Sequence, residues 1–201
     1  MKLYFSSGAC SLAPHIALLE AGLTFETEKV DLKAKVTASG ADFTAINSKG
    51  YVPALVLDNG QLLTEGAAVL QYIADQNPAA GLAPAPGSFE RYRLQEWLTF
   101  IGSEIHKPMG SMFNPAQSAD WKAAVTANLG KRLDWLSQQL EGKDYLLGAQ
   151  FSVADAYLFT VLNWANFVGF AMAQWPVVQA FSARVAARPK VVEALKAEGL
   201  V

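Results

Sequence analysis

The first half of the chain alternates between strand-like and helix-like hydrophobic patterns. Short apolar runs, bounded by polar or turn residues, predict strands, and apolar residues at a spacing of three and four predict helices. Asp58-Asn59-Gly60 lies between two such runs, and Asn-Gly is a strong signal for a β-hairpin. The polar stretch up to about residue 46 has weak helical character. The expected elements are a strand at 2–5, a helix at 11–21, a strand at 25–32, a hairpin of 54–57 with 61–63, and a helix at 65–76.

The second half of the chain predicts helices only. Residues 77–87 are uncharged and rich in proline and glycine, as a boundary between domains should be. Helical patterns begin near five positions, Ser88, Ser118, Ser152, Pro176 and Pro189. At the third of these, Asp155 can complete a capping box. We therefore expect an α/β domain over residues 1–78, a linker over 79–87 and an all-helical domain over 88–201.

One uncharged segment, residues 156–181, is long enough to cross a bilayer. Asn163, Asn166, Gln174 and Pro176 interrupt it, and no aromatic and basic belts flank it. A helix that is apolar on all sides can also be the central helix of a folded domain, and we favour that interpretation.

Composition argues against several classes of function. Eighteen acidic and sixteen basic side chains among 201 residues give a net charge of −2, which does not support a nucleic-acid surface or a polybasic membrane anchor. A single cysteine cannot form an intrachain disulfide, and with only two histidines there is no zinc ligand cluster. No apolar signal region precedes the first strand. We expect a soluble cytoplasmic protein that binds no metal.

The single cysteine, Cys10, lies between the first expected strand and the first expected helix. At a helix N-terminus, unpaired N–H groups and the helix dipole favour the thiolate, so the reactivity of such a cysteine rises. Pro14 is consistent with a helix that starts close to Cys10. The alternative is a buried, inert cysteine that acts as a small hydrophobic residue. Position alone does not decide between these two interpretations.

Two further features fit a site for a peptide-like ligand. A cis bond at Val52-Pro53 would turn the Val52 backbone outward for pairing with an extended peptide, whereas a trans proline would simply start a strand. From these residues alone the trans form is favoured. Glu65 and Gly66 begin a helix, where N–H groups can bind a carboxylate and Glu65 can bind an amino group. The alternative is a helix cap that has no ligand.

Five segments occur together in this chain. They are Gly8-Ala9-Cys10-Ser11-Leu12, Gly50-Tyr51-Val52-Pro53-Ala54-Leu55, Leu63-Thr64-Glu65-Gly66, Trp97 with Glu104 and His106, and Phe151-Ser152-Val153-Ala154-Asp155. In these segments, and over essentially its whole length, the chain resembles the bacterial glutathione transferases of the beta class. The resemblance implies a thioredoxin-like N-terminal domain, an all-helical C-terminal domain and a homodimer.

The resemblance also implies a glutathione site with Cys10, Ser11 and His106 as its catalytic residues. The glutathione sulfur would lie near Cys10, and His106 would hydrogen-bond near that sulfur or polarise the thiol. The residues implied to bind glutathione are Lys35 at the glycyl carboxylate, Val52 and cis-Pro53 at the cysteinyl backbone, Glu65 and Gly66 at the γ-glutamyl end, and Thr99, Ser103 and Glu104 on the long helix of the second domain. Some of these would come from the partner subunit.

The chain departs from the family pattern at Phe5, where many relatives have tyrosine. No phenol is available there, and strand alternation points Tyr4 to the opposite face. We interpret His15 as a structural residue. The first candidates for contact with an apolar electrophile are Met109, Phe113 and Trp164.

Three functions remain open. The first, which we favour, is a glutathione transferase that conjugates the glutathione thiolate to apolar electrophiles. The second is a glutathione-dependent thiol–disulfide oxidoreductase or peroxidase, or a reductive dehalogenase, that uses Cys10. The third is a non-catalytic ligand carrier on the same fold. The sequence does not identify the electrophile, because apolar pockets discriminate weakly between similar apolar partners.

Overall fold

The strands of the first half form one mixed sheet. In the computed structural model, which describes residues 1–201, they are β1 (Lys2–Phe5), β2 (Glu26–Asp31), β3 (Val36–Thr37), β4 (Ala54–Val56) and β5 (Leu62–Thr64). The strand order is β3-β2-β1-β4-β5. β1 and β2 are parallel, and the expected β4–β5 hairpin adds antiparallel to β1. The short edge strand β3 was not predicted from the sequence.

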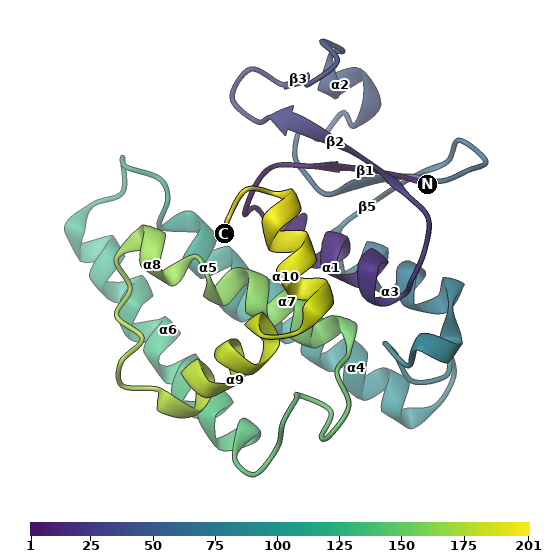
Figure 1. Cartoon of the computed structure of the whole chain (residues 1–201). Coiled ribbons are helices and arrows are strands. Elements are labelled where there is room, and N and C mark those ends of the chain that lie inside the picture. Colours follow the sequence, from purple (N-terminus) through teal and green to yellow (C-terminus); the bar gives the residue numbers. More distant parts are fainter. The chain divides into compact units, whose positions relative to one another are not determined.

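Helices cover this sheet, as the helical periodicity predicts. Three longer helices, α1 (Leu12–Glu20), α3 (Gly66–Gln76) and α10 (Pro189–Ala197), accompany the short α2 (Phe43–Ile46) and the 3₁₀ turn η1 (Pro78–Ala80). α1 packs against both α3 and α10 (Figure 1). Every residue from Leu12 to Leu18 is buried, because α1 lies between its neighbours. This part of the chain has the expected thioredoxin-like fold.

The chain forms two compact units whose boundaries differ from the expected domains. The first comprises residues 1–83 together with 188–201, and the second comprises residues 84–187. The last helix therefore belongs to the first unit, whereas we expected it in the helical domain. Its buried Val191, Ala194 and Leu195 form the apolar face of α10. Helical periodicity in the sequence shows that such a face exists but not which helix it packs against.

The second unit is entirely helical. It contains α4 (Phe89–Phe100), the π-helical segment η2 (Ile101–His106), α5 (Lys107–Ser111), α6 (Ala119–Leu140), α7 (Val153–Leu162), α8 (Ala165–Val168) and α9 (Pro176–Ala186). All residues of α7 are buried, so it is the central helix expected from its uncharged sequence. The uncharged segment is divided between α7, α8 and the start of α9. None of the helices has both the length and the apolar character needed to cross a membrane.

The expected capping box fixes the start of α7. The Asp155 carboxylate accepts hydrogen bonds from the Ser152 N–H at 2.8 Å, the Ser152 hydroxyl at 2.7 Å and the Leu146 N–H at 2.8 Å. Burial raises the pKa of Asp155 to about 6, although these hydrogen bonds act in the opposite direction. The box ties the loop before α7 to its first turn.

Candidate active site

The Cys10 thiol lies at the N-terminal end of α1, as the sequence predicts. Cys10 directly precedes Ser11, which occupies the N-cap position of that helix. The half-buried thiol forms no disulfide and donates to the Val52 carbonyl at 3.1 Å. A turn before it is closed by the Ala9 N–H and the Ser6 carbonyl at 3.0 Å, with Gly8 at φ +70°. Glycine suits this position because other residues rarely adopt positive φ.

The Ser11 hydroxyl forms hydrogen bonds with the backbone of this turn. It is fully buried, accepts a hydrogen bond from the Ser6 N–H at 3.1 Å and lies 3.3 Å from the Ser6 carbonyl, to which it can donate. Because these hydrogen bonds join Ser11 to Ser6, the hydroxyl helps to fix the backbone conformation of the segment before Cys10. Its geometry therefore favours a positioning role over direct contact with a ligand.

The Val52–Pro53 peptide bond is cis. The trans form favoured from the local residues was wrong, and the cis form implied by the family resemblance is present. The Val52 carbonyl accepts from Cys10, while the Val52 N–H donates to no group within the chain. Lys35 is at φ +59°. Its side chain packs against Gly50 of this loop, and its ammonium donates to the Gly50 carbonyl at 2.6 Å. Lys35, from the turn between β2 and β3, therefore contacts the loop that carries Val52.

Glu65 adopts an unusual backbone conformation at the start of α3. Its φ of +69° is uncommon for a residue with a side chain, and such strain is often found at functional sites. The Glu65 carbonyl accepts from the N–H groups of Ala68 and Val69, whereas those of Gly66 and Ala67 form no backbone hydrogen bond. A Cβ added at Gly66 would contact nothing within 4 Å. The helix therefore begins with two N–H groups that have no backbone acceptor, an arrangement suited to a carboxylate.

The Glu65 carboxylate has partners that the sequence analysis missed. Lys49 forms an ion pair with it and donates to the Thr64 hydroxyl at 3.0 Å. The Tyr51 hydroxyl lies 3.2 Å from the same carboxylate. These contacts join the loop before cis-Pro53 to the start of α3. The only sequence signal was the presence of Lys49 and Tyr51 next to the Val52-Pro53 motif.

The site residues expected from the second unit follow one another along one helical run. Thr99 is in α4, and its hydroxyl donates to the Gln95 carbonyl at 2.8 Å. Ser103 and Glu104 lie in η2, where the Ser103 hydroxyl donates to the Thr99 carbonyl at 3.0 Å. Glu104 forms an ion pair with Arg132 at 2.6 Å. One long helix was expected here, and its residues 101–106 are π-helical; such segments often occur at functional sites.

His106 ends the π-helical segment in an apolar environment. Its Nδ1 lies 2.6 Å from the Tyr157 hydroxyl, and its ring packs edge-on against Trp164 with centroids 4.9 Å apart. Burial, with a smaller effect from Lys107, lowers the pKa of His106 to about 4. The imidazole is therefore neutral at neutral pH, so it can accept or donate a hydrogen bond but supplies no positive charge.

Comparison with known proteins assigns both halves of the chain to one family. Residues 8–76 match the model of the glutathione S-transferase N-terminal domain, and residues 100–189 match that of the glutathione S-transferase C-terminal domain. Glutathione S-transferase GstA of Escherichia coli O157:H7 is 45% identical over 200 residues, covering 100% of both chains. The chain belongs to the glutathione S-transferase family.

Solved structures confirm the class of this glutathione S-transferase. The beta-class enzyme of Sphingomonas chungbukensis is 50% identical, with a TM-score of 0.96 over 100% of both chains. A sphingomonad glutathione S-transferase complexed with glutathione is 53% identical, also with a TM-score of 0.96 over 100% of both chains. The expected assignment to the bacterial beta class is thereby confirmed.

In this glutathione S-transferase the two aromatic residues of β1 pack in different surroundings. Tyr4 is buried with Phe43 in a cluster that includes Val52, and its ring lies 5.8 Å from that of Phe43. Phe5 is buried on α1's side of the strand, 5.9 Å from the ring of His15. The opposite directions of the two side chains follow the expected strand alternation.

Two of the three residues considered for contact with an electrophile, Phe113 and Trp164, pack against each other, and the third lies in the core. Trp164 is buried against His106, and the exposed Phe113 packs edge-on against it at 5.9 Å. Met109 is fully buried, so its side chain belongs to the core of the helical unit. No group of three or more His, Cys, Asp and Glu side chains is arranged to hold a metal ion.

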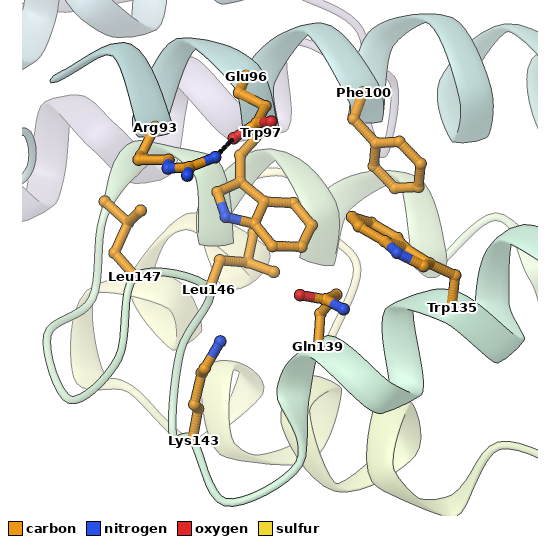
Figure 2. Close-up of a pocket in the computed structure, with 9 residues that line it drawn as sticks. All are labelled: Arg93, Glu96, Trp97, Phe100, Trp135, Gln139, Lys143, Leu146 and Leu147. Carbon is orange, nitrogen blue, oxygen red and sulfur yellow. Dashed lines mark hydrogen bonds and ion pairs between the residues drawn. The ribbon is translucent and has the colours of Figure 1, made fainter. Parts of the chain in front are cut away.

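The helical unit of the transferase also carries a separate surface cavity of about 420 Å³. Figure 2 shows it between α4, α6 and the loop after α6, with Trp97 at its centre. The rings of Trp97, Phe100 and Trp135 contact one another at centroid distances of 4.7–5.9 Å. The charged residues at its edge include Arg93, which pairs with Glu96 at 2.8 Å. This cavity contains none of the predicted glutathione-site residues.

Proposed function

We propose that this transferase conjugates the thiolate of glutathione to apolar electrophiles. One observation carries the proposal: three connected segments of the first unit carry a thiol, a backbone N–H that lies beside a cis-proline and has no partner within the chain, and a helix N-terminus. The Cys10–Val52 hydrogen bond joins the first two features, and the Tyr51–Glu65 hydrogen bond joins the last two. The glutathione complex of the sphingomonad relative supports glutathione as the co-substrate.

Each part of glutathione has a chemically matched group in the first unit. The cysteinyl backbone pairs with Val52 before cis-Pro53. The γ-glutamyl carboxylate binds the free N–H of Gly66, and the γ-glutamyl ammonium binds Glu65. The ammonium of Lys35 binds the glycyl carboxylate. Because Gly66 offers no hydroxyl, binding at the γ-glutamyl end depends on backbone N–H groups.

Catalysis in this proposal consists of stabilising the glutathione thiolate. Free thiols are mostly protonated at neutral pH, so positioned donors near the sulfur increase the reactive fraction. Cys10, at the N-terminus of α1, lies near the sulfur, and Ser11 holds the turn that carries it. His106, which is neutral, hydrogen-bonds near the sulfur or accepts its proton. Since no phenol is present at Phe5, these groups replace the tyrosine common among relatives.

Thr99, Ser103 and Glu104 complete the proposed glutathione site, some of them in the partner subunit of a homodimer. Apolar surface on the helical unit supports such a dimer, since Phe89, Tyr92 and Trp135 are 66%, 60% and 41% exposed. Aromatic residues are enriched at protein interfaces relative to the rest of the surface. We also propose a cytoplasmic location, consistent with a single cysteine and no disulfide.

Steady-state conjugation with 1-chloro-2,4-dinitrobenzene, compared with glutathione titration calorimetry, tests this proposal. Glu65→Gln removes the charge that receives the γ-glutamyl ammonium, and we expect the dissociation constant for glutathione to rise about ten-fold or more. Glu26→Gln, at another exposed acidic position in the same unit, is the matched control. Unchanged affinity in folded Glu65→Gln removes the proposed γ-glutamyl contact. A wild-type rate equal to the uncatalysed background overturns the conjugation function.

A further inference from the structure

The Cys10 turn is contacted by a buried carboxylate from the last residues of the chain. Glu198 follows α10 as its C-cap, and its side chain has no exposed surface. A buried carboxylate is costly unless both oxygens have partners. Both partners of Glu198 flank Cys10 in sequence: one oxygen accepts from the Gly8 N–H at 2.9 Å, and the other lies 2.9 Å from Nδ1 of His15.

The end of α10 holds this carboxylate in place. Gly199 is at φ +70°, its N–H donates to the Lys196 carbonyl at 3.0 Å, and the Leu200 N–H donates to the Leu195 carbonyl at 2.9 Å. These two bonds form a Schellman motif, a well-defined helix ending. The backbone position of Glu198 is therefore set by the helix and not by a flexible tail.

Leu200, in the same segment, lies close to Gly8. A Cβ added at Gly8 would lie 3.4 Å from a methyl carbon of Leu200. The turn is therefore held by a hydrogen bond from Glu198 and by apolar contact from Leu200. On its other side, His15 is buried between the rings of Phe5 and Phe25, at 5.9 Å and 5.7 Å. Because His15 belongs to α1, its contact with Glu198 links the carboxylate to that helix.

We propose that Glu198 is a positioning residue for the Cys10 turn, acting through Gly8 and His15. The proposal rests on the proposed function, because it assigns the turn the task of placing Cys10 and the start of α1 against the glutathione sulfur. Loss of the carboxylate removes the hydrogen bond that the Gly8 N–H donates and allows the turn to shift. Small displacements of reacting groups cause large losses in rate.

Three variants of Glu198 separate this role from plain structural support. Glu198→Ala removes both contacts, whereas Glu198→Gln retains an oxygen for Gly8 and an amide that can donate to His15. Glu198→Asp keeps the charge but withdraws the carboxylate by one methylene. Glu193→Gln, exposed on the same helix and paired with Lys190, is the control. Thermal unfolding of each variant measures stability independently of the activity readouts.

The readouts are kcat and KM for glutathione and the rate at which iodoacetamide alkylates Cys10, at 10 °C or more below the unfolding midpoint of each variant. We expect Glu198→Ala and Glu198→Asp to lower kcat/KM about ten-fold and to change the alkylation rate more than three-fold, with Glu198→Gln near the control. If Glu198→Ala does not fold, Glu198→Asp decides the question. Values within two-fold of the control in the folded variants overturn the proposal. The alkylation rate tests Glu198 even if the wild type fails to conjugate glutathione.

Discussion

The Tyr157 hydroxyl lies 2.6 Å from Nδ1 of His106. Because the imidazole is neutral, this hydrogen bond decides which ring nitrogen carries the proton and thus what the other nitrogen offers. Tyr157 lies in α7, whose start is fixed by the Ser152–Asp155 capping box. A structural motif therefore orients a proposed catalytic side chain.

Replacing Tyr157 by phenylalanine should affect the rate more than substrate affinity. Without the hydroxyl, the ring of His106 loses its fixed tautomer but remains packed against Trp164. We expect kcat with 1-chloro-2,4-dinitrobenzene to fall about three- to ten-fold, with KM for glutathione within two-fold of wild type. Tyr72→Phe on α3 is the control. A normal kcat in Tyr157→Phe would show that the tautomer of His106 does not limit the reaction.

Lys49 should compete with the γ-glutamyl ammonium for Glu65. The ion pair is largely exposed, so it is screened by solvent and stabilises the ligand-free site only weakly. Lys49→Met should therefore lower KM for glutathione by at most about five-fold, and the difference from wild type should shrink in high salt. Lys33→Met is a control at another exposed turn. A higher KM in Lys49→Met would instead indicate that this ammonium binds a glutathione carboxylate.

The buried Asp155 predicts a specific pH dependence of stability. Its pKa of about 6 in the folded protein exceeds the ordinary value of 3.8, so the folded state binds the proton more tightly than the unfolded state. The contribution of Asp155 to stability is therefore full below pH 3.8 and decreases as the pH rises through 6. We expect urea unfolding to show wild type losing about 1 kcal/mol relative to Asp155→Asn between about pH 5 and 7.5. Parallel pH profiles of the two proteins would contradict a raised pKa at Asp155.

The aromatic cavity in Figure 2 gives a test of the proposed homodimer. Trp135→Glu introduces a charge beside Phe100 and Trp97, which should weaken any interface formed by this surface. We expect sedimentation velocity at micromolar concentration to show monomers for Trp135→Glu and dimers for wild type. Lys122→Glu, a charge-changing substitution elsewhere on α6, should remain dimeric. A dimeric Trp135→Glu would place the interface on another surface.

Features with a local chemical cause could be predicted from the sequence. The hairpin follows from Asn59-Gly60, the start of α7 from Ser152 and Asp155, and the position of Cys10 from the strand and helix patterns on either side of it. Each depends on residues close together in the chain. Periodicity and capping report such short-range effects directly.

Features that depend on distant contacts could not be predicted in the same way. Lys49 and Tyr157 were missed because their partners, Glu65 and His106, are separated from them by 16 and 51 positions. The π-helical segment has no composition that distinguishes it from an α-helix. The cis form of Pro53 was favoured only by resemblance, since the local residues also allow trans.

The division of the chain has a consequence for its biosynthesis. The first unit is interrupted by the second, and its remaining segment, residues 188–201, is synthesised only after the helical unit. Until then α1 lacks α10, and Gly8 lacks the carboxylate of Glu198. The helical unit is synthesised and can fold while the Cys10 turn is still incomplete. A stalled or truncated chain would thus carry an unfinished thiol site on an otherwise complete helical unit.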